Sequence, residues 1–357
     1  MRHSANLDIL RSVAVSVVLV DHLTISLLFR QGALHKTVLE EYVFNLSQAG
    51  VLAFFVHTSL VLMYSLERMT RNAGPVALRF YVRRLFRIYP LSIFCIVLAI
   101  IFHIPSDTWG GVNIASARTA FSNLLLLQNF FWKGNILAPL WSLPYEVQMY
   151  LVLPALYFLT LRRRAVAYLC GLYVAICICL FLYHWKLVDH IGNAEYVPCF
   201  LSGVLCYSLR NRIKARVSAS LWLPLVILLI LGYCLVGGSR GTGNFWVAWV
   251  FCLFLGLSVN FFHDSSQKHV NLAAERIALY SYGVYLIHVP ILYLVFVVLG
   301  IANSVWGALL FVALTLIGST TTYHLIESPL IELGRKLSSG RLNAANPIPT
   351  QDAQPGV

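Results

Sequence analysis

Long apolar runs recur along the whole chain, and they restrict its fold more than any other feature. About ten of them approach the roughly 20 residues that a helix needs to cross a bilayer, although several are short or partly polar. We therefore predict an all-α fold, a polytopic membrane helical bundle, rather than two or three soluble domains. The expected spans are 9–29, 44–65, 89–105, 141–160, 165–183, 196–209, 219–237, 244–262, 279–299 and 304–326.

Composition and charge agree with a membrane protein. With 59% apolar and 11% charged residues, the chain is more apolar than a soluble domain, for which roughly 45–50% and 25% are typical. A net charge of +12 is compatible with nucleic-acid binding, but the basic residues lie between the spans, where the positive-inside rule places them. We therefore expect no nucleic-acid partner, an even number of spans, and both termini in the cytoplasm.

The sequence also gives predictions for the long loop, the end of the chain and the cysteines. The apolar stretch 121–132, within the long loop 106–140, is too short to span and is expected to be re-entrant or interfacial. The polar, proline-containing end of the chain predicts a disordered cytoplasmic tail at 338–357. The eight cysteines lie in or beside apolar runs without a CxxC pair, which indicates buried thiols rather than disulfides or a metal site.

The first candidate site lies on the first span. Arg11 and His22 are eleven residues apart, so on a helix they share one stripe and are separated by about 16 Å. Ionisable groups inside a span indicate a functional site facing the protein interior, and an imidazole can act in general acid–base catalysis. Asp8 precedes Arg11, and Asp21 adjoins His22 but points about 100° away and need not pair with it. The alternative is a structural histidine held by an interhelical hydrogen bond.

The segment FYVRRLFRIYP, residues 80–90, is the second candidate, at the inner mouth of the third span. Arg83, Arg84 and Arg87 fall within two helical turns, and arginine binds phosphate bidentately. A nucleotide-bearing donor such as a coenzyme A thioester fits this cluster. The alternative is charge that sets topology and contacts lipid headgroups.

A third candidate is LWSLPYEVQMYLVLP, residues 140–154. Ser142, Glu146 and Tyr150 are spaced by four residues and share a helix face. Glu146 lies near the outer end of its span, where an acid could orient an imidazole or bind a sugar hydroxyl. It could equally be a buried acid that pairs with an arginine.

Two later segments supply weaker candidates. In YSYGVYLIHVP, residues 280–290, His288 is intramembrane and is as compatible with a structural as with a catalytic role. In HLIESPLIELGRKL, residues 324–337, Glu327 could pair with an inner arginine. The other histidines, His57 among them, are weaker candidates. The sequence holds no HExxH motif, so no metal is expected.

Taken together, these motifs resemble the acyltransferase-3 family of integral membrane proteins. That family includes bacterial O-antigen, exopolysaccharide, peptidoglycan and nodulation-factor O-acetylases. The resemblance extends in family order to about residue 337. It rests on LDILRSVAVSVVLVDH, GVLAFFV, FYVRRLFRIYP, LWSLPYEVQMYLVLP, EYVPCFLSGVLCY, SYGVYLIHVP and HLIESPLIELGRKL.

The resemblance implies about ten spans, a cytosolic acyl-CoA donor and an acceptor hydroxyl on the far side of the inner membrane. It makes Arg11 and His22 the essential pair and Glu146 the membrane acid. The arginine cluster at 83–87 matches the family's basic motif. One departure follows FFV, where the family has a small SGF-type turn and this chain has His-Thr-Ser-Leu at 57–60.

We therefore expect residues 1–337 to form an acyltransferase-3 transmembrane domain in the bacterial cytoplasmic (inner) membrane. The expected reaction moves an acetyl group from acetyl-CoA to a hydroxyl of a saccharide or lipid-linked saccharide. In it, His22 is the general base or carries the acyl group itself, and Arg11 stabilises negative charge. The alternatives are a transporter or flippase whose intramembrane His and Glu relay protons, and a scaffold for polymer-export enzymes.

Overall fold

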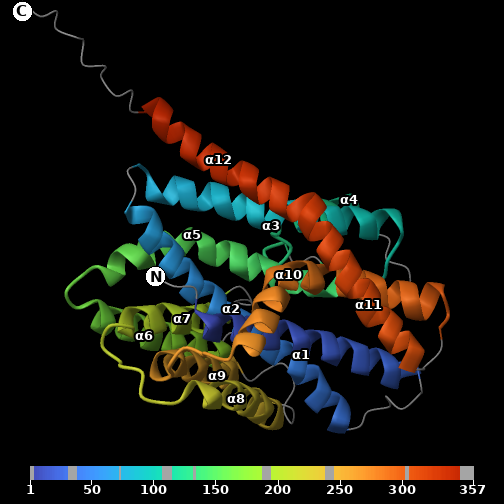
Figure 1. Ribbon diagram of the computed structural model, residues 1–357, viewed down its shortest axis with the longest axis horizontal. Coiled ribbons are helices and arrows are strands. Elements are labelled where there is room, and N and C mark those ends of the chain that lie inside the picture. The colour runs from blue at the N-terminus through green and yellow to red at the C-terminus, as the bar shows by residue number, and fades with distance from the viewer. Residues whose placement is uncertain are drawn as a thin grey trace, which may run out of the picture.

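The computed structural model describes residues 4–30, 38–71, 74–106, 115–131, 134–186, 194–237, 245–301 and 305–345. Within these ranges the chain forms helices and no β-strand, which confirms the predicted all-α class (Figure 1). The α-helices are α1 Ala5–Arg30, α2 Val38–Thr70, α3 Val76–Ile101, α4 Ala117–Leu124, α5 Leu143–Thr160, α6 Ala165–Lys186, α7 Val197–Leu209, α8 Trp222–Gly237, α9 Phe245–Ser258, α10 Lys268–Tyr293, α11 Val305–Thr322 and α12 Ser328–Ala345.

Seven segments of the described chain are long and apolar enough to cross a membrane, so the protein is a polytopic membrane protein. The remaining expected runs correspond to α5, α7 and α9, which are shorter or less apolar. The seven segments are Ala5–Leu28, Asn45–Thr70, Val76–Ile101, Ala165–Tyr183, Ala219–Gly237, Lys268–Val298 and Val305–Ser338.

Two helices begin well before the apolar runs that predicted them. Helix α3 begins at Val76 rather than at residue 89, and α10 begins at Lys268 rather than at residue 279. Hydropathy marks the apolar part of a helix, whereas arginine, lysine and alanine extend the helix itself because they are good helix formers. As a result the arginine cluster 83–87 lies inside α3, on the helix and not in a loop before it.

The short apolar stretch 121–132 does not cross the bundle. It forms α4, whose N-terminus is capped by Ser116, and the turns that follow it. Asn123 and Gln128 fix these turns by hydrogen bonds to the Gly134 and Leu140 carbonyl oxygens. The segment is therefore one short helix against the bundle.

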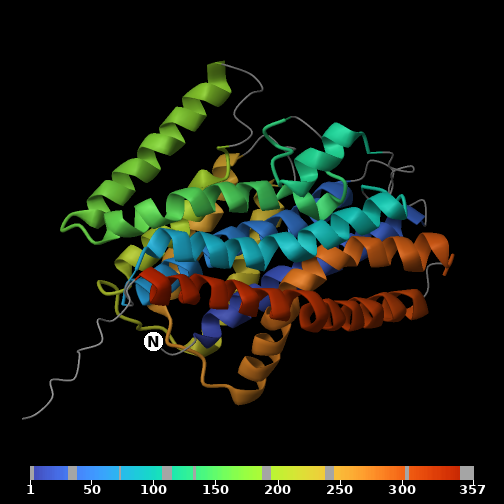
Figure 2. The same cartoon turned by 90° about the horizontal axis from the view of Figure 1, so that it is seen from above.

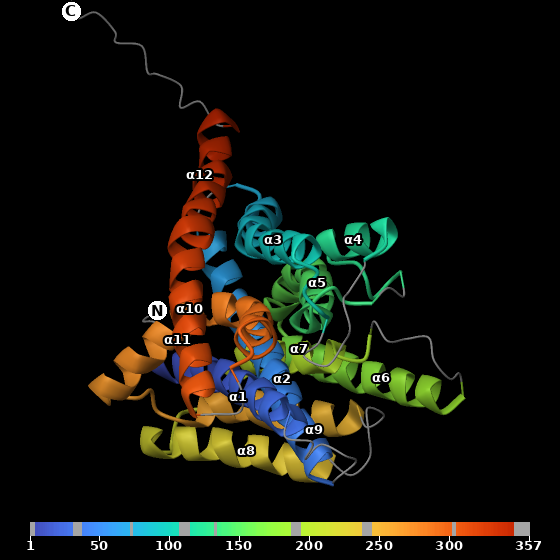
Figure 3. The ribbon, with the colours of Figure 1, turned by 90° about the vertical axis from the view of Figure 1, so that its right-hand side faces the viewer.

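Helix α2 is the centre of the bundle, with α1 on one side and α7 on another (Figure 3). A Cβ on Gly50 would lie 2.6 Å from the carbonyl oxygen of Ala14, and one on Gly203 would lie 2.4 Å from that of Val56. Only glycine allows backbones to approach this closely. Helix α6, by contrast, projects outward from the side of the bundle (Figure 2).

Two anchors fix the helices that carry the candidate residues. The carboxylate of Asp264 accepts hydrogen bonds from the backbone N–H groups of Ala5 and Asn6 at the start of α1. The other anchor is a continuous helical rod from α11 through a π-helical turn at Tyr323–Glu327 into α12, which packs beside α3 (Figure 3). Helix α12 extends to Ala345, into the segment predicted to be disordered, and residues 346–357 lie outside the described ranges.

Candidate active site

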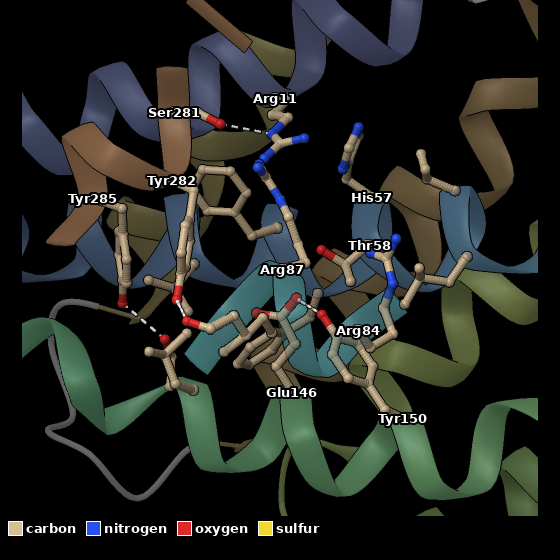
Figure 4. Close-up of a pocket in the computed structure, with 18 residues that line it drawn as sticks. Arg11, His57, Thr58, Arg84, Arg87, Glu146, Tyr150, Ser281, Tyr282 and Tyr285 are labelled. Carbon is tan, nitrogen blue, oxygen red and sulfur yellow. Dashed lines mark hydrogen bonds between the residues drawn. The ribbon is translucent and has the colours of Figure 1, made fainter. Parts of the chain in front are cut away.

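A cavity of about 100 Å³ lies inside the bundle among α1, α2, α3, α5 and α10 (Figure 4). Aromatic and aliphatic side chains line part of this cavity, and charged or hydroxyl-bearing side chains line the rest. Six of the candidate residues from the sequence line it together: Arg11, Arg84, Arg87, Ser142, Glu146 and Tyr150. The fold thus brings residues from three separate motifs to one interior space.

Arg11 enters this cavity from α1. Its Nε donates a hydrogen bond to Ser281 Oγ on α10 at 2.7 Å, which fixes the guanidinium and leaves its other nitrogens toward the space. The guanidiniums of Arg11 and Arg87 point toward one another (Figure 4). Asp8, one turn earlier on α1, does not line this cavity but a second one described below.

The three arginines of α3 have different surroundings. Arg87 forms an ion pair with the buried Glu327, Nη1 to Oε2 at 2.9 Å, as the sequence analysis proposed for Glu327. Arg84 lines the cavity, and its buried Nε has no hydrogen-bond partner among the described residues. Arg83 instead donates from Nε to Ser338 Oγ on α12 at 2.9 Å and does not line the cavity.

The predicted face of α5 forms the opposite wall. Tyr150 donates its hydroxyl hydrogen to Glu146, four residues earlier, so this acid is bonded to its own helix and not to His22 (Figure 4). Ser142 and Tyr285 share a hydroxyl–hydroxyl hydrogen bond of 2.8 Å, and the Tyr285 hydroxyl also lies 2.9 Å from the Pro139 carbonyl oxygen. These contacts tie α5 to α10 and close the cavity at that end.

His22 lies outside the lining of this cavity, although it shares a stripe of α1 with Arg11. Ala14 and Val18 occupy the same stripe between them, and Gly50 of α2 packs directly onto both. This close helix contact separates the two ends of the stripe. On the α10 side of this contact, Tyr285 lines the cavity.

A second imidazole meets His22 on that side. The rings of His22 and His288 lie edge to face with centroids 4.9 Å apart, and the Tyr285 ring lies 6.3 Å from that of His288. The side chain of His22 is 25% exposed, whereas His288 is buried. Asp21, also buried, has its Oδ2 3.9 Å from His22 Nδ1.

Both imidazoles are held through the same nitrogen. His22 Nδ1 lies 2.9 Å from the Val18 carbonyl oxygen, and His288 Nδ1 lies 2.8 Å from that of Tyr285. A carbonyl can only accept, so each Nδ1 carries the hydrogen, and each neutral ring keeps its lone pair at Nε2. Nε2 of His288 is buried and has no partner among the described residues. The arrangement can accept a proton.

A larger cavity of about 510 Å³ lies where α1 begins and α2 ends. It adjoins the first one, because Arg11, His57 and Val61 line both. Its wall includes Arg68 and Arg71 at the end of α2. The residues that line the two cavities together extend from this end of the bundle to Tyr285.

Sequence reasoning undervalued His57. It lines both cavities. In the sequence it is a weaker candidate than the others, because no spacing rule pairs it with another group. The signal that pointed to it is the departure from the family pattern at 57–60. For Arg68 and Arg71, which are among the basic residues between the spans, the sequence indicates only a role in setting the topology.

An interior cavity lined by arginines and an acid, within a bundle of apolar helices, makes the chain a polytopic membrane protein with a polar interior. The comparisons with known proteins then give its family. The family model of the acyltransferase domain, Acyl_transf_3, matches residues 4–324, and the chain therefore belongs to this family of membrane acyltransferases. Searches of the curated proteins and of the solved structures found no match.

Proposed function

We propose that the protein is an O-acetyltransferase of the bacterial cytoplasmic membrane. In this proposal it moves an acetyl group from acetyl-CoA to a hydroxyl of a cell-envelope or exported saccharide. The observation that supports it most is the route of two adjoining cavities, which carries arginine side chains from the end of the bundle to its interior. A saccharide with a lipid carrier would reach the other end through the bilayer.

The residues present fit an anionic thioester donor. Arg11 and Arg84 present cationic nitrogens to the first cavity, and the Nε of Arg84 has no partner in the described part of the chain. Arg11, held by Ser281 and about 16 Å along α1 from His22, is proposed to bind the polar arm of the donor, away from the reacting carbonyl. The Glu327 carboxylate already balances the charge of Arg87, so Arg87 is proposed to line the cavity without binding the anionic donor.

His22 is proposed as the group that takes the proton of the acceptor hydroxyl. Its Nε2 has the lone pair that this step needs, because Nδ1 is bonded to Val18. The hydroxyl oxygen then forms a bond to the thioester carbonyl carbon, the carbon–sulfur bond breaks, and the proton passes to the departing sulfur. The exposed part of the imidazole is the side from which the acceptor approaches.

Tyr285 stands between the cavity and the two imidazoles. Its hydrogen bonds to Ser142 and Pro139 hold it across the route. The proposal therefore requires this ring to rotate when the acyl end of the donor passes, and His288 then lines the path to His22.

The test is to incubate membranes that contain the protein with radiolabelled acetyl-CoA and to isolate the envelope saccharides. Label on the saccharide, removable by mild base as an ester, is the expected result. Membranes with an empty vector are the control. Saccharide movement that needs no acetyl-CoA, without labelling, would contradict the proposal and favour a transporter.

A further inference from the structure

The larger cavity has the size and position of a ligand site in its own right. At about 510 Å³ it falls within the range of roughly 300–1,000 Å³ that is typical for small-molecule sites, whereas the inner cavity of about 100 Å³ does not. The inner cavity can hold an acyl group and part of a chain. A bulkier part of the same ligand must lie elsewhere along the route.

Besides Arg11, three arginines line the larger cavity, and all three lie at one end of the bundle. Arg210 Nη2 lies 3.4 Å from Glu67 Oε2, while its buried Nε has no partner among the described residues. Arg71 lies 3.7 Å from the other oxygen of Glu67 with its side chain 66% exposed. Arg68 is exposed on the same rim. The Glu67 carboxylate thus pairs with two of the three guanidiniums, and among the described residues no ion pair engages the third, that of Arg68.

The other acids of this cavity do not cancel that excess. Asp264 accepts hydrogen bonds from the first turn of α1 and from Ser4, and a helix N-terminus itself carries positive partial charge. Asp8 lies deeper, on the same helix as Arg11. Tyr64 adds an aromatic surface beside the arginines. Guanidiniums with an aromatic wall suit a phosphorylated nucleotide, since arginine binds phosphate and bases stack on rings.

The distance along α2 between the shared residues of the two cavities and the outer arginines suits one extended ligand. His57 and Val61 line both, and Arg71, which directly follows α2, lies fourteen residues beyond His57. That interval corresponds to about 21 Å of helix, so a ligand reaching both ends must carry a long, narrow arm between its anionic and reactive parts.

We propose that the larger cavity binds the adenosine 3′-phosphate 5′-diphosphate end of coenzyme A, with Arg68, Arg71 and Arg210 on its phosphates. The pantetheine arm then passes His57 and Val61 into the inner cavity. This inference rests on the proposed function and deepens it. It moves phosphate recognition from the α3 arginines to the ends of α2 and α7.

The experiment measures binding of adenosine 3′,5′-bisphosphate to the full-length protein by calorimetry in nanodiscs of zwitterionic lipid. The variants Arg68→Ala and Arg71→Ala are both on exposed side chains, so folding is preserved. Each is expected to raise the Kd by about tenfold, the loss of one charged hydrogen-bonding contact. Arg163→Ala and Arg212→Ala, exposed arginines outside both cavities, serve as matched controls and are expected to leave the Kd unchanged.

A kinetic arm separates this inference from the proposed function. The same two variants are expected to raise the KM for acetyl-CoA and to leave the KM for acetyl-pantetheine, which lacks the nucleotide, unchanged. Acetyl transfer from acetyl-CoA with neither effect would overturn the inference and leave the acyltransferase standing. Nucleotide binding that disappears when phosphatidylglycerol is added would assign the arginines to lipid headgroups and would also overturn it. A protein that binds the nucleotide and transfers no acetyl group would instead remove the proposed function.

Discussion

The two ends of one stripe on α1 differ in how their polar groups are satisfied. At one end, Arg11 and Arg87 are held by partners on other elements, Ser281 on α10 and Glu327, and they line a cavity. Around His22, each imidazole is held by a carbonyl of its own helix, which leaves Nε2 to exchange a proton. Gly50 packs between the two ends. From this comparison we propose that one end holds charge and the other moves protons.

The largest expected effect tests the proton-handling end. The variant His22→Ala removes the proposed base, and we expect kcat for acetyl transfer to fall by about 10²–10⁴-fold, the range for loss of a general base. The measurement is saccharide labelling at saturating acetyl-CoA, normalised to the amount of folded protein. His269→Ala, an exposed histidine at the start of the same α10 that carries His288, is the control. Labelling at the normal rate in the His22 variant would exclude it as base and as acyl carrier.

The charge-holding end is tested through its buried ion pair. Arg87→Met leaves the Glu327 carboxylate buried without its partner, which is expected to destabilise the fold by about 3–5 kcal/mol. The double variant Arg87→Met/Glu327→Gln removes both charges and should recover most of that loss. Thermal unfolding in detergent is the measurement, and Glu332→Gln, which breaks an exposed pair on α12, is the matched control. Equal unfolding midpoints for the single and double variants would show that the pair is not coupled.

A variant of Glu146, the acid that lines the cavity, tests the charge-holding end further. Glu146→Gln keeps the shape and the hydrogen bond from Tyr150 but removes the negative charge beside Arg84. We expect kcat to fall by about tenfold, the worth of one charged hydrogen bond. Glu146→Asp should retain part of the rate because it restores the charge. A Gln variant within twofold of the original kcat would show that the charge of Glu146 has no part in the reaction.

The smallest effect is expected at Arg83, the arginine that faces α12 instead of the cavity. Arg83→Ala removes only its contact with Ser338 and should change the KM for acetyl-CoA by less than about twofold. Arg84→Ala, one residue along and facing the cavity, should raise it by about tenfold. Steady-state kinetics with both variants decides the point. Equal effects would show that the two arginines act as one cluster.

Much of the fold follows from the sequence, because apolar runs must lie in helices inside a bilayer. The ends of α3 and α10 could not be predicted, since hydropathy does not detect the polar turns that continue a helix. The stripe of Arg11 and His22 is correct as helix geometry. The close contact at Gly50 that divides it depends on which helix packs there, and periodicity carries no such information.

The part of the candidate site that could be predicted is the part fixed by the spacing of residues on a single helix. The face shared by Ser142, Glu146 and Tyr150 follows from spacing alone. Arg83 and Arg84 differ by about 100° around α3, so they cannot both face one cavity, but the sequence does not say which one does. His57 lines both cavities because of how α2 packs in the bundle, and the sequence does not contain this information.

The central claim is that the donor reaches the interior through the junction of the two cavities. Val61 lines both of them, so Val61→Trp would fill the junction and leave His22 and the far end of the bundle unchanged. The direct measurement is the rate of label transfer from acetyl-CoA in this variant, with its unfolding midpoint as the control for folding. We predict a folded protein that has lost transfer. A folded variant with the original rate would contradict the account.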